Sequence, residues 1–193
     1  MDKNILGLVS VAVSMAGYGS YLVSIFRKRT KPHAFSWLVW SILMAIVFFA
    51  QMSDKGGAGS WVTGVSALMC SLIAMAAIRH GEKSITRSDW LAFIGALIAI
   101  PVWRLTKDPL AAVLVATVID ALAYYPTFRK SYLKPFEENF QTYCLDILKW
   151  VVAFFALEHY SAVTLTYPLF LLAANSTLVA MILVRRQKAN HAE

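Results

Sequence analysis

The chain is poor in the residues that build disulfide frameworks, metal centres and common catalytic motifs. It has only two cysteines, Cys70 and Cys144, and both lie inside apolar stretches without a CxxC spacing. This excludes an extracellular disulfide scaffold and argues against zinc or redox chemistry. The histidines share no ligand spacing, and no glycine-rich phosphate loop, HExxH, GxSxG or GxGD motif occurs. We therefore expect neither an enzyme nor a metal or cofactor site.

Charged residues are also scarce. They make up 15% of the 193 residues, whereas 59% are hydrophobic and the mean hydropathy is +0.59. Ordinary soluble domains are roughly 45–50% apolar, so the composition predicts an all-α integral membrane protein. Seven apolar stretches are long enough to cross a hydrocarbon core of roughly 30 Å at about 1.5 Å per residue. They lie at 5–26, 34–52, 59–79, 89–106, 109–128, 137–157 and 162–184.

The basic residues fall mainly in alternate links between these seven stretches, which places them on one side of the predicted membrane. The net charge of +7 could indicate a nucleic-acid partner, but most of the 18 Lys and Arg residues occupy alternate links and the tail. Cytoplasmic loops retain Lys and Arg during insertion, so we expect the N-terminus outside and the C-terminus in the cytoplasm. The charge predicts orientation in a plasma (inner) membrane, with the lipid bilayer rather than nucleic acid as the partner. The links and tail contain Arg27, Lys28, Arg29, Lys31, Arg79, Lys83, Arg87, Arg129, Lys130, Lys134, Arg185, Arg186 and Lys188.

The chain repeats itself after about 106 positions. Because each repeat contains three helices, an odd number, direct fusion would invert the second copy, and one extra helix restores its orientation. We expect seven transmembrane helices in a 3+1+3 parallel-repeat arrangement, with a first repeat at 1–80, an inverting linker helix at 81–107 and a second repeat at 108–193. The matching positions are Phe48 and Phe154, Phe49 and Phe155, Trp61 and Tyr167, Ala67 and Ala173, Leu72 and Leu178, and Arg79 and Arg185.

The segment from Tyr124 to Ser131 contains Pro126-Thr127 close to the end of an apolar stretch. It resembles the PQ-loop family, which includes the SWEET sugar carriers and the cystinosin-like amino-acid exporters. In that family a Pro-Gln pair lies near the cytoplasmic end of the first helix of each repeat. Here Thr127 replaces the glutamine, and the first copy has Ser24-Ile25 at this place. The resemblance implies a 3+1+3 carrier with Pro126 as a hinge.

Three ionisable residues lie at membrane depth, where each costs roughly 2.5–3.5 kcal/mol on insertion scales. They are Asp120, Asp146 and Lys149, and all belong to the second repeat. The spacing of three between Asp146 and Lys149 places them on one helical face, where they are able to pair. Such a pair could be purely structural, could contact an amine-bearing substrate, or could bind and release a proton. The resemblance implies the last role, because cystinosin-like exporters carry a Leu-Asp at the place of Leu145-Asp146.

Four further polar or aromatic residues are candidates for substrate binding. Asn175 lies midway along its stretch, and its amide offers a donor and an acceptor; the resemblance to SWEET carriers implies a substrate contact there, and bridging two helices is the alternative. Trp40, Tyr143 and Tyr124 are able to stack on a ring or a cation, whereas aromatic belts at the two interfaces explain many such residues without a ligand.

We therefore expect a carrier that moves a small polar metabolite, such as an amino acid, a sugar or a vitamin-like compound, by alternating access with proton coupling. Asp120 joins Asn175 and the aromatic residues in its binding site. A receptor or scaffold of the same fold that transports nothing is the main alternative, and an intramembrane enzyme using Asp120 with Asp146 comes third. The substrate and the oligomeric state, including a homo-oligomer, stay open.

Overall fold

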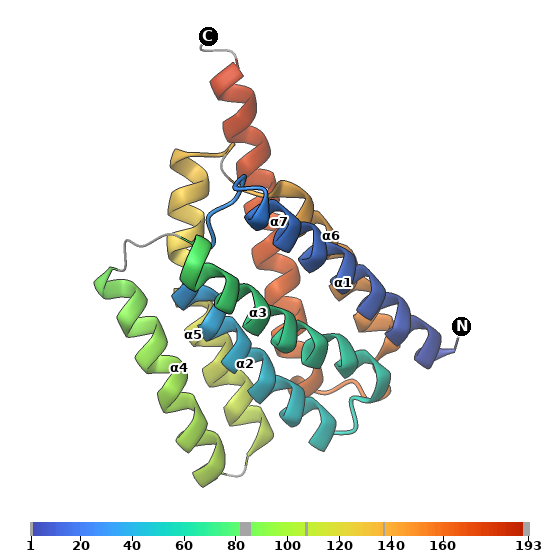
Figure 1. The fold of residues 1–193 in the computed structure, drawn as a ribbon. Helices are drawn as coiled ribbons and strands as arrows, with labels where there is room; N and C mark the ends of the chain where they lie inside the picture. Colours follow the sequence, from blue (N-terminus) through green and yellow to red (C-terminus); the bar gives the residue numbers. More distant parts are fainter. Residues whose placement is uncertain (1, 82–85, 107, 137, 191–193) are drawn as a thin grey trace.

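The computed structural model describes residues 2–81, 86–106, 108–136 and 138–190. Within these ranges the chain forms seven α-helices, one short 3-10 helix and no β-strand. Each predicted apolar stretch corresponds to one α-helix (Figure 1). The elements are α1 (Lys3–Phe26), α2 (Ala34–Ser53), η1 (Gly57–Ser60), α3 (Trp61–His80), α4 (Arg87–Thr106), α5 (Pro109–Leu133), α6 (Phe140–Ala156) and α7 (Ala162–Asn190).

Short polar residues begin several of these helices. The Asp2 carboxylate accepts a hydrogen bond from Asn4 N at 2.9 Å, and Asp108 does the same for Leu110 N at 2.9 Å. These contacts satisfy backbone N–H groups that the first helical turn leaves without partners. Pro109 follows Asp108 at the start of α5, where its missing N–H costs nothing.

Among the described residues, five helical segments are long and apolar enough to cross a membrane. They are Lys3–Phe26, Ala34–Ser53, Gly57–His80, Pro109–Leu133 and Ala162–Ala189. Helix α6 is apolar too, but its 17 residues make it shorter than the others. The lengths of these helices are compatible with membrane insertion of the bundle.

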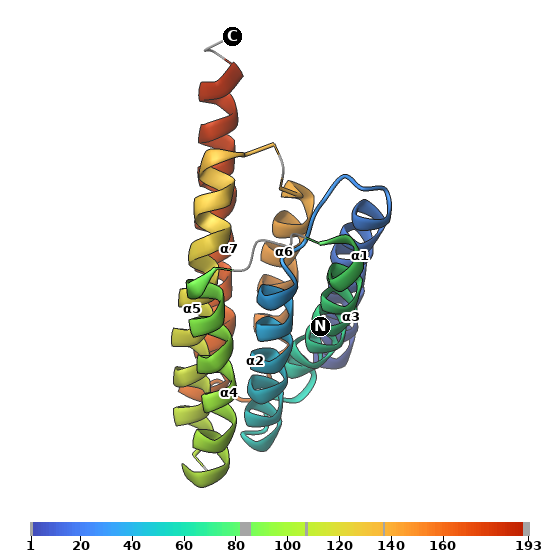
Figure 2. The ribbon, with the colours of Figure 1, turned by 60° about the vertical axis from the view of Figure 1, so that its left-hand side comes forward.

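We call α1, α2 and α3 the first group of helices and α5, α6 and α7 the second group. Helix α3 packs against both α1 and α2, and α7 packs against both α5 and α6. Between the groups, α1 contacts α6 and α2 contacts α5, with a smaller contact between α2 and α7. Helix α4 lies against α2 and α5 at one side of the bundle (Figures 1 and 2).

The outer surface of the bundle is more apolar than that of a water-soluble one. Large apolar side chains face outward, among them Leu68 at 68% and Ile78 at 74% exposure. Within the apolar core lie several polar side chains, of which Asp120, Lys149 and Asn175 are fully buried. A bundle of this kind exposes an apolar outer surface that suits lipid. It keeps in its interior the polar groups whose contact with lipid would cost free energy.

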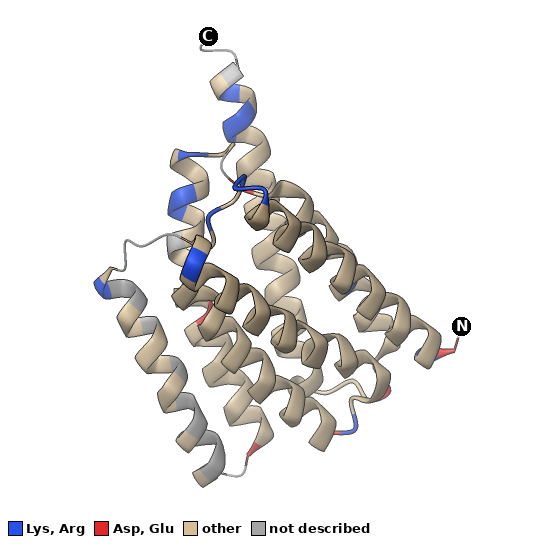
Figure 3. Ribbon diagram, viewed as in Figure 1, with Lys and Arg blue, Asp and Glu red and all other residues tan. Residues whose placement is uncertain are grey.

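Lys and Arg gather at one end of the bundle, which we call the basic end. It comprises the loop after α1, the last turns of α3, α5 and α7, and the start of α4 (Figure 3). The opposite end carries Asp2, the α2–α3 loop with Asp54, and the α6–α7 loop. The charge asymmetry expected from the sequence is therefore present in space.

Candidate functional site

A small cavity lies where the two helix groups meet. Its volume is about 20 Å³, which is room for about one water molecule. Both groups contribute to its wall, so movement of one group against the other changes its size. We call it the central cavity; its lining residues are Tyr18, Tyr21, Trp37, Trp40, Met44, Cys70, Tyr124, Thr142, Tyr143, Asp146 and Leu171.

Aromatic rings form most of this wall and pack on one another. The ring centroids of Tyr21 and Trp37 are 4.7 Å apart, those of Trp37 and Trp40 5.0 Å, and those of Trp40 and Tyr124 5.6 Å. These separations fall in the range of favourable aromatic pairs. The result is a continuous aromatic surface that runs from α1 through α2 to α5.

Asp146 is the charged residue of the described cavity lining. Its Oδ1 lies 2.6 Å from Lys149 Nζ, as their spacing of three residues on α6 predicts. The Lys149 side chain is fully buried, whereas 15% of the Asp146 side chain stays exposed. The pair therefore presents its carboxylate to the cavity and keeps its ammonium behind it.

Lys149 joins α6 to the first group of helices. Its Nζ donates hydrogen bonds to Tyr18 Oη at 2.9 Å and to Ser66 Oγ at 3.4 Å, and Ser66 in turn lies 3.2 Å from Ser14 Oγ. The ammonium also lies 4.3 Å from the centre of the Tyr18 ring, in the geometry of a cation–π contact. Three polar groups from α1, α3 and α6, those of Tyr18, Ser66 and Asp146, thus meet at one ammonium.

Asn175 lies one layer behind the cavity wall. Its Oδ1 accepts a hydrogen bond from Tyr124 Oη at 3.0 Å, and its Nδ2 is buried without a hydrogen-bond partner. The amide therefore holds the Tyr124 ring in place and retains one unused donor.

Asp120 is buried one helical turn before Tyr124 on α5. Its carboxyl faces the indole of Trp40 on α2 and the phenol of Tyr167 on α7. Trp40 Nε1 and Tyr167 Oη are donors directed at this carboxyl, but their geometry falls short of a completed hydrogen bond, so these two atoms and both Asp120 oxygens are buried without hydrogen-bond partners. This differs from Asp146, whose charge Lys149 balances.

The structure thus brings most of the predicted site residues together. Trp40, Tyr124, Tyr143 and Asp146 line the central cavity directly. Asn175, Asp120 and Lys149 form a second layer in contact with that lining. The predicted hinge falls within α5, which continues through position 126; the Pro126 side chain lies outside the described residues.

Several residues of the site were not predicted from the sequence. Cys70 lines the cavity, although the sequence analysis gives it no role, and Ser14 and Ser66 complete the Lys149 network. A small polar residue in an apolar helix gives little signal, because it also packs well between helices. Contacts between α1, α3 and α6 join positions far apart in the chain, so only the tertiary structure reveals them.

A chain of polar contacts links the cavity to the basic end. Tyr143 Oη donates to Glu138 Oε2 at 3.3 Å, and Glu138 Oε1 lies 2.8 Å from Lys130 Nζ. Arg186 donates to Pro135 O at 3.0 Å and to Glu138 O at 3.2 Å, which holds the α5–α6 loop against α7. These contacts hold the side chains between the cavity and the basic end to one another.

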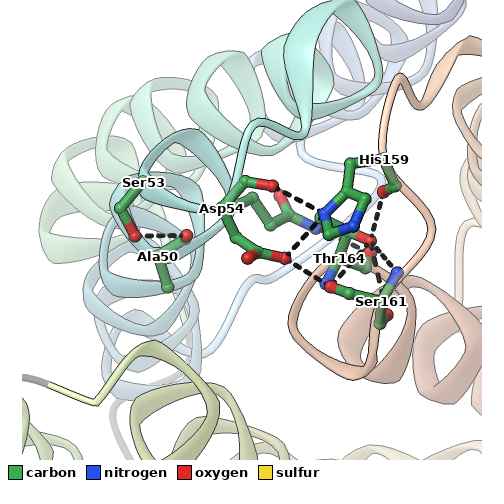
Figure 4. Close-up of polar contacts among 7 residues, drawn as sticks. Ala50, Ser53, Asp54, His159, Ser161 and Thr164 are labelled. Carbon is green, nitrogen blue, oxygen red and sulfur yellow. Dashed lines mark hydrogen bonds and ion pairs between the residues drawn. The ribbon is translucent and has the colours of Figure 1, made fainter.

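Loops from both groups also bind each other at the opposite end. Asp54, after α2, lies 3.3 Å from His159 Nδ1 and accepts a hydrogen bond from Ser161 Oγ, while Thr164 Oγ1 donates to His159 O at 2.7 Å (Figure 4). We call these four residues the loop clasp. Behind it, Gln51 Nε2 donates to Thr164 O at 3.2 Å. The clasp closes this end of the bundle.

Asp54→Ala and Ser161→Ala are expected to be non-additive in the free energy of unfolding. Each single change removes the same interaction, so the double variant loses less than the sum, with a coupling of about 0.5–3 kcal/mol. Denaturant unfolding in detergent measures this cycle. Asp108→Ala combined with Ser161→Ala is the control and adds within about 0.5 kcal/mol, because Asp108 caps α5. If the losses in the free energy of unfolding from Asp54→Ala and Ser161→Ala simply add, the two residues of the loop clasp do not stabilise the protein through a shared interaction.

No family model, curated protein or solved structure matches this chain.

Proposed function

We propose that this chain is an integral membrane carrier that moves a small polar metabolite by alternating access. The central cavity carries this proposal, because it is buried between two helix groups and combines aromatic walls with one charged pair. Cavities of this kind bind small molecules through apolar and aromatic walls with a few placed polar groups. A volume of about 20 Å³ is too small for a metabolite, so binding requires the groups to separate.

Seven spans in a 3+1+3 arrangement account for the observed helix contacts. If α1, α2 and α3 correspond to α5, α6 and α7, then the contact between α1 and α6 is equivalent to that between α5 and α2. Both contacts exist, and in each group the third helix packs against the other two. Helix α4, which packs on α2 and α5, serves as the linker that restores the orientation of the second repeat. This arrangement is the one expected of a SWEET-like or PQ-loop carrier.

The basic end is proposed to face the cytoplasm. Lys and Arg that flank spans remain on the cytoplasmic side during insertion, and here they gather at one end of the bundle. The loop clasp then closes the outside, and the contacts of Glu138 with Tyr143 and Lys130 close the inside. A conformation closed at both ends is an intermediate of alternating access.

The substrate is proposed to bind against Asp146 and the aromatic wall. The Asp146 carboxylate is an acceptor for substrate hydroxyl or amino groups, and the rings of Trp40, Tyr124 and Tyr143 stack on planar or cationic groups. Because Lys149 already neutralises Asp146, the site as a whole suits a polar compound without a large net charge. Asn175 positions Tyr124 from behind.

Asp146→Asn is expected to reduce counterflow by about tenfold or more, the equivalent of about 1.4 kcal/mol of lost binding. The measurement uses proteoliposomes and a panel of labelled amino acids, sugars and vitamins. Asp108→Asn is the matched control, because it makes the same chemical change at an exposed helix cap and keeps full counterflow. Wild-type protein that is silent across the panel and binds a peptide or protein tightly would instead indicate a receptor or scaffold.

A further inference from the structure

Asp120 is a buried carboxyl of the site to which the described residues offer no counter-charge. The side chain is fully buried, and neither carboxyl oxygen has a hydrogen-bond partner. No Lys, Arg or His among the described residues forms an ion pair with it. A carboxylate retained for structure accepts hydrogen bonds or pairs with a cation, and Asp120 does neither.

Among the described residues, the groups that face this carboxyl are uncharged. Trp40 on α2 and Tyr167 on α7 face it, and the nearby titratable groups are Tyr124 on α5 and Cys70 on α3. The described side chains of α4, which also packs on α5, give it no ion pair. An isolated carboxylate in such surroundings costs far more free energy than the neutral acid. The surroundings therefore fit a carboxylic acid that carries its proton.

The position of Asp120 couples it to the central cavity. Trp40 lines the cavity with one part of its indole ring and faces Asp120 with its N–H. Tyr124, one turn further along α5, also lines the cavity and stacks near Trp40, with ring centroids 5.6 Å apart. A substrate that enters the cavity must displace these two rings. When Trp40 moves, its indole no longer shields the Asp120 carboxyl from the cavity.

We propose that Asp120 is the proton-carrying acid of this protein, which holds its proton in the closed conformation and releases it when Trp40 moves away. Asp146 stays ionised beside Lys149 and binds the substrate. The step involves only the O–H bond of the Asp120 carboxyl: it breaks when the proton passes to water in the open cavity, and it forms again before closure. Its link to transport rests on the carrier function proposed above.

Infrared spectroscopy of protein with isotope-labelled aspartate tests this assignment without a substrate. The wild type near neutral pH is expected to show the carbonyl band of a protonated aspartic acid, and Asp120→Asn to lose it. Asp146→Asn, the matched variant, keeps the band. The proposal is overturned if the wild type lacks the band, if the band survives in Asp120→Asn, or if Asp146→Asn abolishes it.

A transport measurement separates this proposal from the carrier function itself. Asp120→Asn proteoliposomes are expected to lose the extra accumulation of labelled panel compounds that an acidic exterior drives in the wild type. Acid-driven accumulation that persists in Asp120→Asn overturns the role of Asp120. Wild-type vesicles without any counterflow refute the carrier, whereas the infrared result still decides whether Asp120 carries the proton.

Discussion

Lys149→Met is expected to destabilise the folded protein by about 3–5 kcal/mol, the largest loss we predict for a single substitution. Lys149 is fully buried and contacts Asp146, Tyr18 and Ser66 through one ammonium. Its removal leaves the Asp146 carboxylate without a counter-charge, and removing one partner of a buried pair costs about this much. Unfolding in detergent, followed by circular dichroism, measures the loss.

Two further variants identify the cause. Asp146→Asn combined with Lys149→Met is expected to recover most of the stability, because replacing both partners of a buried pair leaves no bare charge. Lys188→Met, at an exposed position in the last turn of α7, changes stability by no more than about 0.5 kcal/mol. If Lys149→Met destabilises the protein no more than Lys188→Met does, the network around the ammonium does not stabilise the fold.

Gly59→Ala is expected to cost about 1–3 kcal/mol through overpacking. A Cβ at Gly59 would lie 2.7 Å from Leu157 N and 2.8 Å from Ala153 O. Both atoms belong to the backbone at the end of α6, so no flexible side chain is able to move aside. The substitution forces η1 away from α6, which loosens the end of the bundle that the loop clasp closes. Thermal unfolding in detergent reports the change.

Gly19→Ala is the control for this substitution. A Cβ at Gly19 has no other heavy atom within 4 Å, and the residue lies inside α1. Alanine in a helix interior is favoured over glycine by about 0.5–1 kcal/mol, so this variant keeps or gains stability. Equal losses in the two variants would show that the close approach of η1 to α6 is not responsible.

The positions of the helices could be predicted from the sequence because hydropathy is a local property. All seven apolar stretches correspond to helices, and differences occur at their ends. Helix α5 continues to Leu133 rather than 128, and α7 to Asn190 rather than 184. The predicted ends mark where apolar residues stop, whereas a helix continues for as long as its backbone hydrogen bonds do. Helix α6 begins at Phe140 rather than 137 because Asn139 caps it.

The candidate site was predictable only where its geometry is local. The Asp146–Lys149 pair follows from the spacing of three residues on one helix. The contacts of Lys149 with Tyr18 and Ser66 join residues 131 and 83 positions apart, and no periodic pattern indicates them. The contrast between a paired Asp146 and an unpaired Asp120 is likewise a property of packing, because the sequence shows only that both are acidic and deep.

If all seven helices span the bilayer, as proposed, the short length of α6 has a consequence for the membrane. Its 17 residues span about 26 Å, whereas a typical hydrocarbon core is about 30 Å thick and the 24 residues of α1 span about 36 Å. A bilayer around α6 must thin locally, while α1 must tilt to stay within it, and each adjustment costs free energy that rises with hydrophobic mismatch. We therefore expect the proposed carrier to match thin bilayers best, so that lipid chain length influences where it resides and how readily its two helix groups part.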